Sequence, residues 1–256
     1  MKLILKIAIT GLMVAYLGLC AALYIFQRNF LYFPTPEVHL NSAEAIYQGN
    51  ANARIKIWKV ASGNKRAIIY FGGNAEEVSR NIEPFKNYLA GYDVYLMNYR
   101  GFSGSGGTPN ESEIYQDSLS LYDFIASEYD GISVIGRSLG SGVATYLAAN
   151  RKVEKVSLFT PYDSVVNVAK VKLPFVPVSI LLHDHYDSVG RAHKITSPTL
   201  IITAQNDQVI LKRSTDALVV ALSNADVKQV EIPATNHLTV STASYFWEML
   251  RDFFAE

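Results

Sequence analysis

Residues 136–140 have the sequence Gly-Arg-Ser-Leu-Gly, which places Ser138 at the centre of a G-x-S-x-G pattern. A strand-like run, residues 133–135, precedes the pattern, and a helix-forming run, residues 143–150, follows it. A sharp turn from a strand into a helix exposes a serine hydroxyl, and flanking glycines avoid steric collisions in so strained a corner. The position of the pattern therefore favours a nucleophilic serine over an ordinary glycine-rich turn.

A serine hydroxyl is a poor nucleophile at neutral pH and needs a base, which a carboxylate in turn orients. His237 is the candidate base, since it follows the last strand-like run and is the only histidine after Asp207. Asp207 is the candidate acid, because it stands in a turn directly after the strand-like run 199–204. Asp163 follows the preceding strand-like run and is the alternative acid, although we expect it to brace a loop.

Attack on a carbonyl creates a negative oxygen, which two backbone N–H groups are expected to bind. The first is the N–H of Leu139, which directly follows the serine and begins the next helix. The second is the N–H of Asn74 in the loop 71–75, Phe-Gly-Gly-Asn-Ala, after an earlier strand-like run. Together with the serine, acid and histidine, these groups predict acyl transfer through a covalent acyl-enzyme.

The elements that position these residues alternate between strand-like and helix-like runs. The predicted strands cover residues 54–60, 66–71, 93–99, 133–136, 155–160, 199–204 and 228–232. This alternation predicts a mainly parallel sheet with helices on both faces. A final helix, at about residues 242–254, would place Phe246, Met249, Leu250 and Phe253 on one buried stripe.

The segment 161–198 interrupts this alternation with two prolines inside an apolar run, residues 173–178. Two interpretations of the segment are open. It forms a small cap over a pocket, or it is a long crossover that packs on the body of the domain.

Residues 7–26 carry no charged side chain, and nine of them are Leu, Ile, Val or Phe. A helix of this length spans roughly 30 Å, the thickness of a bilayer core. This favours a retained membrane helix over a cleaved signal peptide or a buried helix. The predicted organisation is an anchor at residues 1–28, a juxtamembrane linker at 29–40 and one domain at 41–256.

The charges around this span favour an N-terminus on the cytoplasmic side and a catalytic domain on the other side. Lys2, Lys6 and the terminal amine precede the span, whereas Arg28 alone follows it closely. Cys20 is the only cysteine, so no intrachain disulfide can form. Lys+Arg and Asp+Glu both number 23, and this zero formal net charge speaks against a nucleic-acid binder.

Two patterns that could bind a metal or a cofactor are rejected. His183 and His185 share a face only on a strand, which disfavours a metal site with the nearby Asp184 and Asp187. The glycine-rich loop 101–107 lacks the spacing of a dinucleotide-binding turn. No metal and no other cofactor is expected.

The motifs together resemble the membrane-tethered branch of α/β-hydrolases that includes abhydrolase-domain acyl-protein thioesterases, esterases and their bacterial relatives. The resemblance spans nearly everything after the anchor. It rests on the loop 71–75, the Asn-Tyr-Arg-Gly segment 98–109, the elbow at Ser138, the segment 160–164, the Asp207 turn and His237.

The resemblance implies an α/β-hydrolase fold, in the α/β class, behind one transmembrane helix, and the segment 161–198 is the part expected to form a small cap. It also implies a serine hydrolase that cleaves acyl esters or thioesters near a membrane, with a lipid or an acylated protein as substrate. Two alternatives are kept: a serine peptidase of the same fold, and a catalytically silent scaffold that binds partners.

Overall fold

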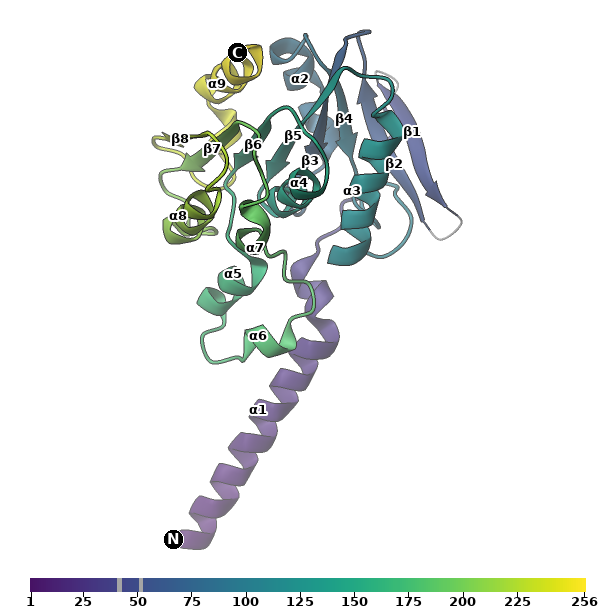
Figure 1. Ribbon diagram of the computed structural model, residues 1–256. Helices are drawn as coiled ribbons and strands as arrows, with labels where there is room; N and C mark the ends of the chain where they lie inside the picture. The colour runs from purple at the N-terminus through teal and green to yellow at the C-terminus, as the bar shows by residue number, and fades with distance from the viewer. Residues whose placement is uncertain (41–42, 51–52) are drawn as a thin grey trace.

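The computed structural model describes residues 1–40, 43–50 and 53–256. Residue 41, at which we expected the domain to begin, lies outside the described residues. The strands form one eight-stranded sheet in the order β1-β2-β4-β3-β5-β6-β7-β8 (Figure 1). They are β1 (Glu44–Asn50), β2 (Ala53–Val60), β3 (Arg66–Phe71), β4 (Asp93–Met97), β5 (Gly131–Arg137), β6 (Val156–Phe159), β7 (Thr199–Ala204) and β8 (Val227–Ile232).

The sheet is mainly parallel, as predicted from the alternating elements. Strands β3 to β8 pair in parallel, whereas β2 pairs antiparallel with both β1 and β4. Strands β3 to β7 are rich in buried apolar residues because helices cover both sides of the sheet, whereas the edge strand β8 buries only Ile232. A parallel sheet brings the carboxyl ends of its strands to one edge, and the candidate residues all follow such ends.

Helices pack on both faces of this sheet. The α-helices are α1 (Lys2–Leu31), α2 (Ile82–Tyr88), α3 (Glu111–Ile125), α4 (Leu139–Asn150), α5 (Val165–Lys172), α6 (Val178–Leu181), α7 (Val189–Ala192), α8 (Lys212–Ala221) and α9 (Ser244–Ala255). Two short 3-10 helices are η1 (Val78–Asn81) and η2 (Val240–Thr242).

Neighbouring residues of one strand enter different cores, because successive side chains point to opposite faces of a sheet. Ile69 of β3 packs in the cluster that contains Val143 of α4. Ile68, its neighbour, packs in the cluster that contains Phe85 of α2 and Phe246 of α9. The expected sheet with helices on both faces is therefore confirmed.

Helix α1 extends away from the domain, and the N-terminus lies at its far end (Figure 1). The helix is long and apolar enough to cross a membrane, by length and composition. It continues to Leu31, so it includes the first three residues of the segment 29–40 that we expected to be a linker. Tyr32, which follows the helix, is buried in the domain.

The segment 161–198, called the cap segment below, contains α5, α6 and α7. Helix α6 lies beside α1 and α5 packs against α6, and both lie away from the sheet (Figure 1). Helix α7 instead packs against α4 and α8, and its Ala192 is fully buried. One part of the segment therefore borders the anchor helix, and another part belongs to the body of the domain.

Candidate active site

Ser138 lies in the turn that joins β5 to α4, with φ 47° and ψ −115°. This is a conformation that residues with a Cβ rarely adopt. Gly136 and Gly140 allow the turn to close. A Cβ on Gly136 would lie 2.5 Å from the carbonyl oxygen of Gly140, and one on Gly140 would lie 2.1 Å from that of Phe71. The G-x-S-x-G pattern is therefore required by the close approach of three backbone segments.

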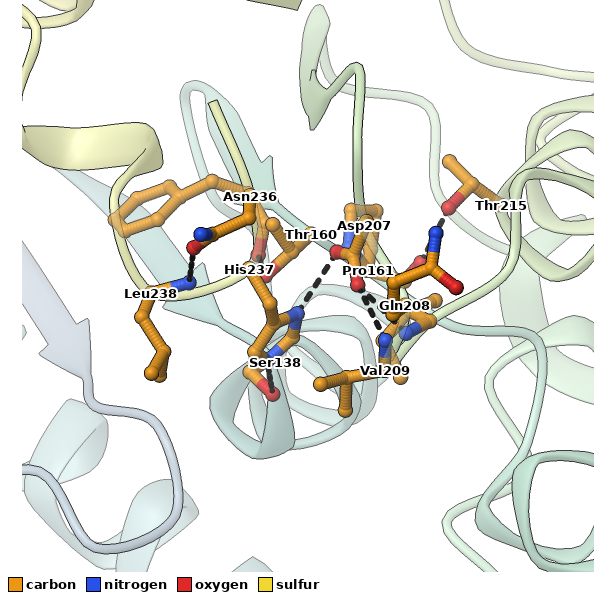
Figure 2. A network of polar contacts seen from close by, with 12 residues as sticks. Ser138, Thr160, Pro161, Asp207, Gln208, Val209, Thr215, Asn236, His237 and Leu238 are labelled. Atoms are coloured by element: carbon orange, nitrogen blue, oxygen red, sulfur yellow. Dashed lines mark hydrogen bonds and ion pairs between the residues drawn. The ribbon is translucent and has the colours of Figure 1, made fainter. Parts of the chain in front are cut away.

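The structure brings Ser138, His237 and Asp207 together in one chain of hydrogen bonds (Figure 2). The Ser138 hydroxyl oxygen lies 2.9 Å from Nε2 of His237. Nδ1 of the same ring lies 2.8 Å from Oδ2 of Asp207. In the tautomer with its proton on Nδ1, His237 donates to Asp207 and accepts from Ser138. The imidazole is thus oriented to take the hydroxyl proton.

Strand register explains why the acid and the base meet. Ala204, the last residue of β7, pairs with Ile232, the last residue of β8, so the two following turns lie side by side. The N–H of Asn206 donates to the carbonyl oxygen of Thr235 at 2.9 Å, which joins the turns directly. The position of His237 is thus set by the neighbouring strand.

Asp207 uses its two carboxylate oxygens for different partners. Oδ1 accepts hydrogen bonds from the N–H groups of Val209 and Ile210, both at 2.8 Å, and leaves Oδ2 for His237. The alternative acid, Asp163, accepts from the N–H of Ser164 at 2.7 Å and from the side chains of Asn167 on α5 and Ser214 on α8. Of the two carboxylates, Asp207 is the one at the histidine.

The two predicted oxyanion donors lie beside the elbow. Within the described part of the chain, no acceptor is paired with the N–H of Leu139 or of Asn74. The side chain of Asn74, by contrast, bonds to the end of the anchor helix. Its Nδ2 donates to the carbonyl oxygen of Leu31 at 2.6 Å, and its Oδ1 accepts from the N–H of Phe33 at 3.0 Å.

Comparison with known proteins supports one superfamily. No family model matches the chain. An uncharacterised protein of Mycobacterium tuberculosis is 27% identical over 235 residues, covering 86% of this chain and 83% of that protein. The α/β-hydrolase domain-containing protein WAV2 of Arabidopsis thaliana is 23% identical, covering 93% and 89%. An uncharacterised membrane protein of Saccharomyces cerevisiae is 23% identical, covering 79% and 76%.

Solved structures share the fold. An esterase of Pyrococcus furiosus superposes with a TM-score of 0.69 at 14% identity, covering 88% of this chain and 97% of that one. The mouse α/β-hydrolase domain-containing protein 10 gives 0.64 at 15% identity, covering 83% and 97%. The chain has the α/β-hydrolase fold. This agrees with the resemblance that its motifs carry.

Sequence reasoning missed two residues that connect the loops of the site. Glu76 lies in the loop after β3, where it accepts from the N–H of Gly73 at 2.5 Å and from the hydroxyl of Tyr70 at 2.7 Å. Arg137, which precedes Ser138, lies 3.3 Å from Glu76 and donates to the carbonyl oxygen of Leu238 at 3.4 Å. In the sequence, only their positions could have drawn attention to them: Glu76 directly follows the loop 71–75, and Arg137 stands inside the G-x-S-x-G pattern.

The charges around these loops are held in defined protonation states. Burial lowers the pKa of Arg137, but Glu76 and Tyr70 beside it together outweigh burial, and the net pKa is above the ordinary value. Burial also raises the pKa of Tyr99 well above its usual range. The Tyr99 phenol therefore remains protonated and donates to the carbonyl oxygen of Gly72 at 2.7 Å.

The histidines of the cap segment have other partners. The N–H of His183 donates to the side chain of Gln27 at 2.6 Å, and its ring packs edge-on against Tyr24. Nε2 of His185 lies 2.6 Å from the carbonyl oxygen of Leu182. Among the described residues, no three His, Cys, Asp or Glu side chains are grouped so as to hold a metal ion.

Proposed function

We propose that the chain is a membrane-anchored serine hydrolase that cleaves acyl esters or thioesters. The observation that carries the proposal is the continuous chain of hydrogen bonds from Ser138 through His237 to Asp207, at 2.9 and 2.8 Å. A serine at ordinary pKa is inert without such a base, and the base is poorly oriented without the carboxylate. A scaffold without catalytic activity has no need of this arrangement.

In the first half of the reaction, His237 takes the proton of the Ser138 hydroxyl while the oxygen attacks the acyl carbonyl. The N–H groups of Leu139 and Asn74 bind the resulting oxyanion. The intermediate then collapses to an acyl-enzyme, and the leaving alcohol or thiol receives the proton from His237. Asp207 stabilises the imidazolium that forms between these two steps.

In the second half, water enters as the leaving group departs. His237 removes a proton from the water, which attacks the acyl group on Ser138. The oxyanion binds to the same two N–H groups, and the Ser138 oxygen leaves with the proton from His237. A carboxylic acid is released and the free serine is restored.

Helix α1 makes the proposed enzyme a single-pass membrane protein. In this proposal the catalytic domain lies on the non-cytoplasmic side, because Lys2 and Lys6 precede the apolar span and only Arg28 follows it closely. Protease added to intact cells should remove a tag from the C-terminus. Protection of the tag until the membrane is permeabilised would contradict this orientation.

Labelling by a fluorophosphonate probe tests the proposed chemistry. The full-length protein in detergent should react with the probe, Ser138→Ala should not, and Ser120→Ala, at an exposed site on α3, should react like the parent. Parent protein that has not been treated with the probe should hydrolyse acyl esters and thioesters. If the folded parent protein fails to label, the scaffold alternative is favoured; if it labels but cleaves only amides, the peptidase alternative is favoured.

A further inference from the structure

A cavity of about 270 Å³ lies between the anchor helix and the cap segment. This is near the lower end of the roughly 300–1,000 Å³ that ligand pockets occupy. One wall comes from the last turns of α1, and the other comes from α5, α6 and the loop between them. The lining residues are Leu23, Gln27, Phe30, Leu31, Val165, Val168, Ala169, Lys172, Leu173, Val176, Val178, Leu181 and Leu182.

The two polar side chains of this lining already have partners in the protein. Gln27 donates to the carbonyl oxygen of Leu181 at 3.0 Å and accepts from the N–H of His183 at 2.6 Å. Lys172 donates to the carbonyl oxygen of Gln208 at 3.0 Å. The rest of the lining is apolar. A polar ligand would lose its hydration there without compensation, whereas an apolar one is favoured.

Polar contacts on both sides of this lining hold the cap segment against α1. The hydroxyl of Tyr16 donates to the carbonyl oxygen of Phe175 at 2.8 Å. Closer to the domain, Arg28 forms an ion pair of 3.1 Å with the buried carboxylate of Asp184. With about 1.5 Å per helical residue, the contacts from Tyr16 to Arg28 cover roughly 18 Å of the anchor helix. These contacts fix the cap segment against α1, so the cavity between them is part of the folded structure.

The inner end of the cavity lies close to the proposed oxyanion loop. Leu31 lines the cavity, and its carbonyl oxygen accepts the 2.6 Å hydrogen bond from the side chain of Asn74. The outer end borders Leu23, which belongs to the apolar span of the same helix. One continuous apolar helix thus leads from the expected bilayer to the side of the catalytic elbow.

We propose that this cavity binds an acyl chain of a membrane lipid whose ester carbonyl is presented to Ser138, an inference that rests on the proposed function. The chain reaches the cavity along α1, so that it passes from the bilayer into the protein without crossing water. For an ester that binds from water, burial of each methylene strengthens binding roughly fourfold, so a chain long enough to fill the cavity gains most. The cavity then selects long acyl chains over short ones.

Photocrosslinking tests the binding independently of catalysis. Full-length Ser138→Ala protein is placed in phosphatidylcholine nanodiscs that contain a phospholipid with a diazirine at the end of one acyl chain. Crosslinks should appear on α5 and on the loop after it, residues 165–178. A second substitution, Ala169→Trp, fills the cavity and should reduce these crosslinks at least fivefold. Val220→Trp, on the exposed face of α8 and outside the cavity, should leave them unchanged.

Absence of crosslinks on residues 165–178, or crosslinks that Ala169→Trp does not reduce, would overturn the proposed cavity. Crosslinking between two copies through these residues, in place of lipid, would overturn it in favour of a second chain as occupant. Crosslinking as expected, in a protein that cleaves no ester or thioester, would reject the proposed function and keep the lipid site.

The second measurement is the acyl-chain-length selectivity of protein that retains Ser138. The ratio of kcat/KM for a laurate ester to that for a butyrate ester should fall about tenfold or more in Ala169→Trp. Val176→Trp blocks the other wall and serves if Ala169→Trp does not fold. Val220→Trp should keep the parental ratio. An unchanged ratio in a folded cavity variant would contradict the proposal.

Discussion

The guanidinium of Arg137 lies 3.3 Å from the carboxylate of Glu76, so the residue before the elbow serine is paired with the loop after β3. Glu76 also binds the N–H of Gly73, next to the proposed oxyanion donor Asn74. Because both carboxylate oxygens have partners, the loop is fixed relative to Ser138. Glu76 is in this view a positioning residue for the oxyanion site.

Replacing Glu76 with Gln should therefore impair the chemical step more than substrate binding. We expect kcat to fall roughly 10- to 100-fold with little change in KM, since a displaced oxyanion donor acts mainly on the transition state. Steady-state kinetics on a good ester substrate measure both constants. Glu154→Gln is the matched control, because its pairing with Arg66 at 3.8 Å is at the surface. An unchanged kcat in folded Glu76→Gln would contradict the positioning role.

Substitution of the two candidate acids should affect two different quantities, kcat for Asp207 and the free energy of unfolding for Asp163. Asp207→Asn should lower kcat by about 10⁴, because the amide no longer holds His237 in the required tautomer. Asp163→Asn should instead lower the free energy of unfolding by roughly 1–3 kcal/mol, because it disturbs buried hydrogen bonds with Ser164, which caps α5, and with Ser214 of α8. Equal losses of kcat in the two variants would show that the assignment of the acid is wrong.

The three residues of the hydrogen-bonded chain could be predicted because each follows a strand and their order along the chain is fixed. Ser138 lies in a recognisable turn, and only one histidine follows Asp207. Each of the seven predicted strands agrees with the observed one to within two residues at both ends. Apolar patterning, which is local, was sufficient for this part of the fold.

Strand β1, by contrast, was missed. It contains Glu44, Gln48 and Gly49, lies at the edge of the sheet and is only partly buried. Its stability comes from antiparallel pairing with β2, for example Ile46 opposite Ile57. Propensity and burial pattern are weak in such a strand, because pairing with a neighbour, rather than its own residues, holds it in place.

The contacts between the anchor and the cap segment could not be predicted either. Arg28 and Asp184 are 156 positions apart, and neither belongs to a motif. Likewise, nothing near Glu76 in the sequence indicates that it meets Arg137. Such pairs depend on the tertiary arrangement of loops, whereas a single sequence shows only local spacing.

The backbone of Ser138 should store strain that a glycine relieves. Its φ of 47° and ψ of −115° are unfavourable for any residue with a Cβ. We expect Ser138→Gly to be more stable than Ser138→Ala by about 1 kcal/mol, since alanine keeps the strain. Chemical unfolding of the two inactive variants side by side measures the difference. Equal or lower stability of the glycine variant would refute the presence of strain.

Asp93 should make stability depend on pH in the acid range. Burial raises the pKa of this carboxyl, but hydrogen bonds from the N–H groups of Ser62 and Asn64 and from the hydroxyl of Tyr129 outweigh it and hold the pKa below its usual value. The charged form thus stabilises the fold at neutral pH. This stability is lost as the pH falls from the ordinary pKa through the lowered one.

The variant Asp93→Asn tests this dependence. It should be less stable than the parent protein at neutral pH, by roughly 1.5–3 kcal/mol, because hydrogen bonds to a charged acceptor are lost. Its Tm should fall less steeply than that of the parent below about pH 4, the ordinary pKa of an aspartate. Parallel curves of Tm against pH for the two proteins would disprove the contribution of Asp93.

The most direct test of the proposed chemistry is the mass of the protein during turnover of an acyl ester. Rapid acid quenching followed by mass spectrometry should show a population heavier by one acyl group, with the modification on Ser138 in the peptide map. His237→Ala should lack this population, and so should Ser138→Ala. Turnover with no acylated protein, or acylation at another residue that persists in Ser138→Ala, would contradict the account.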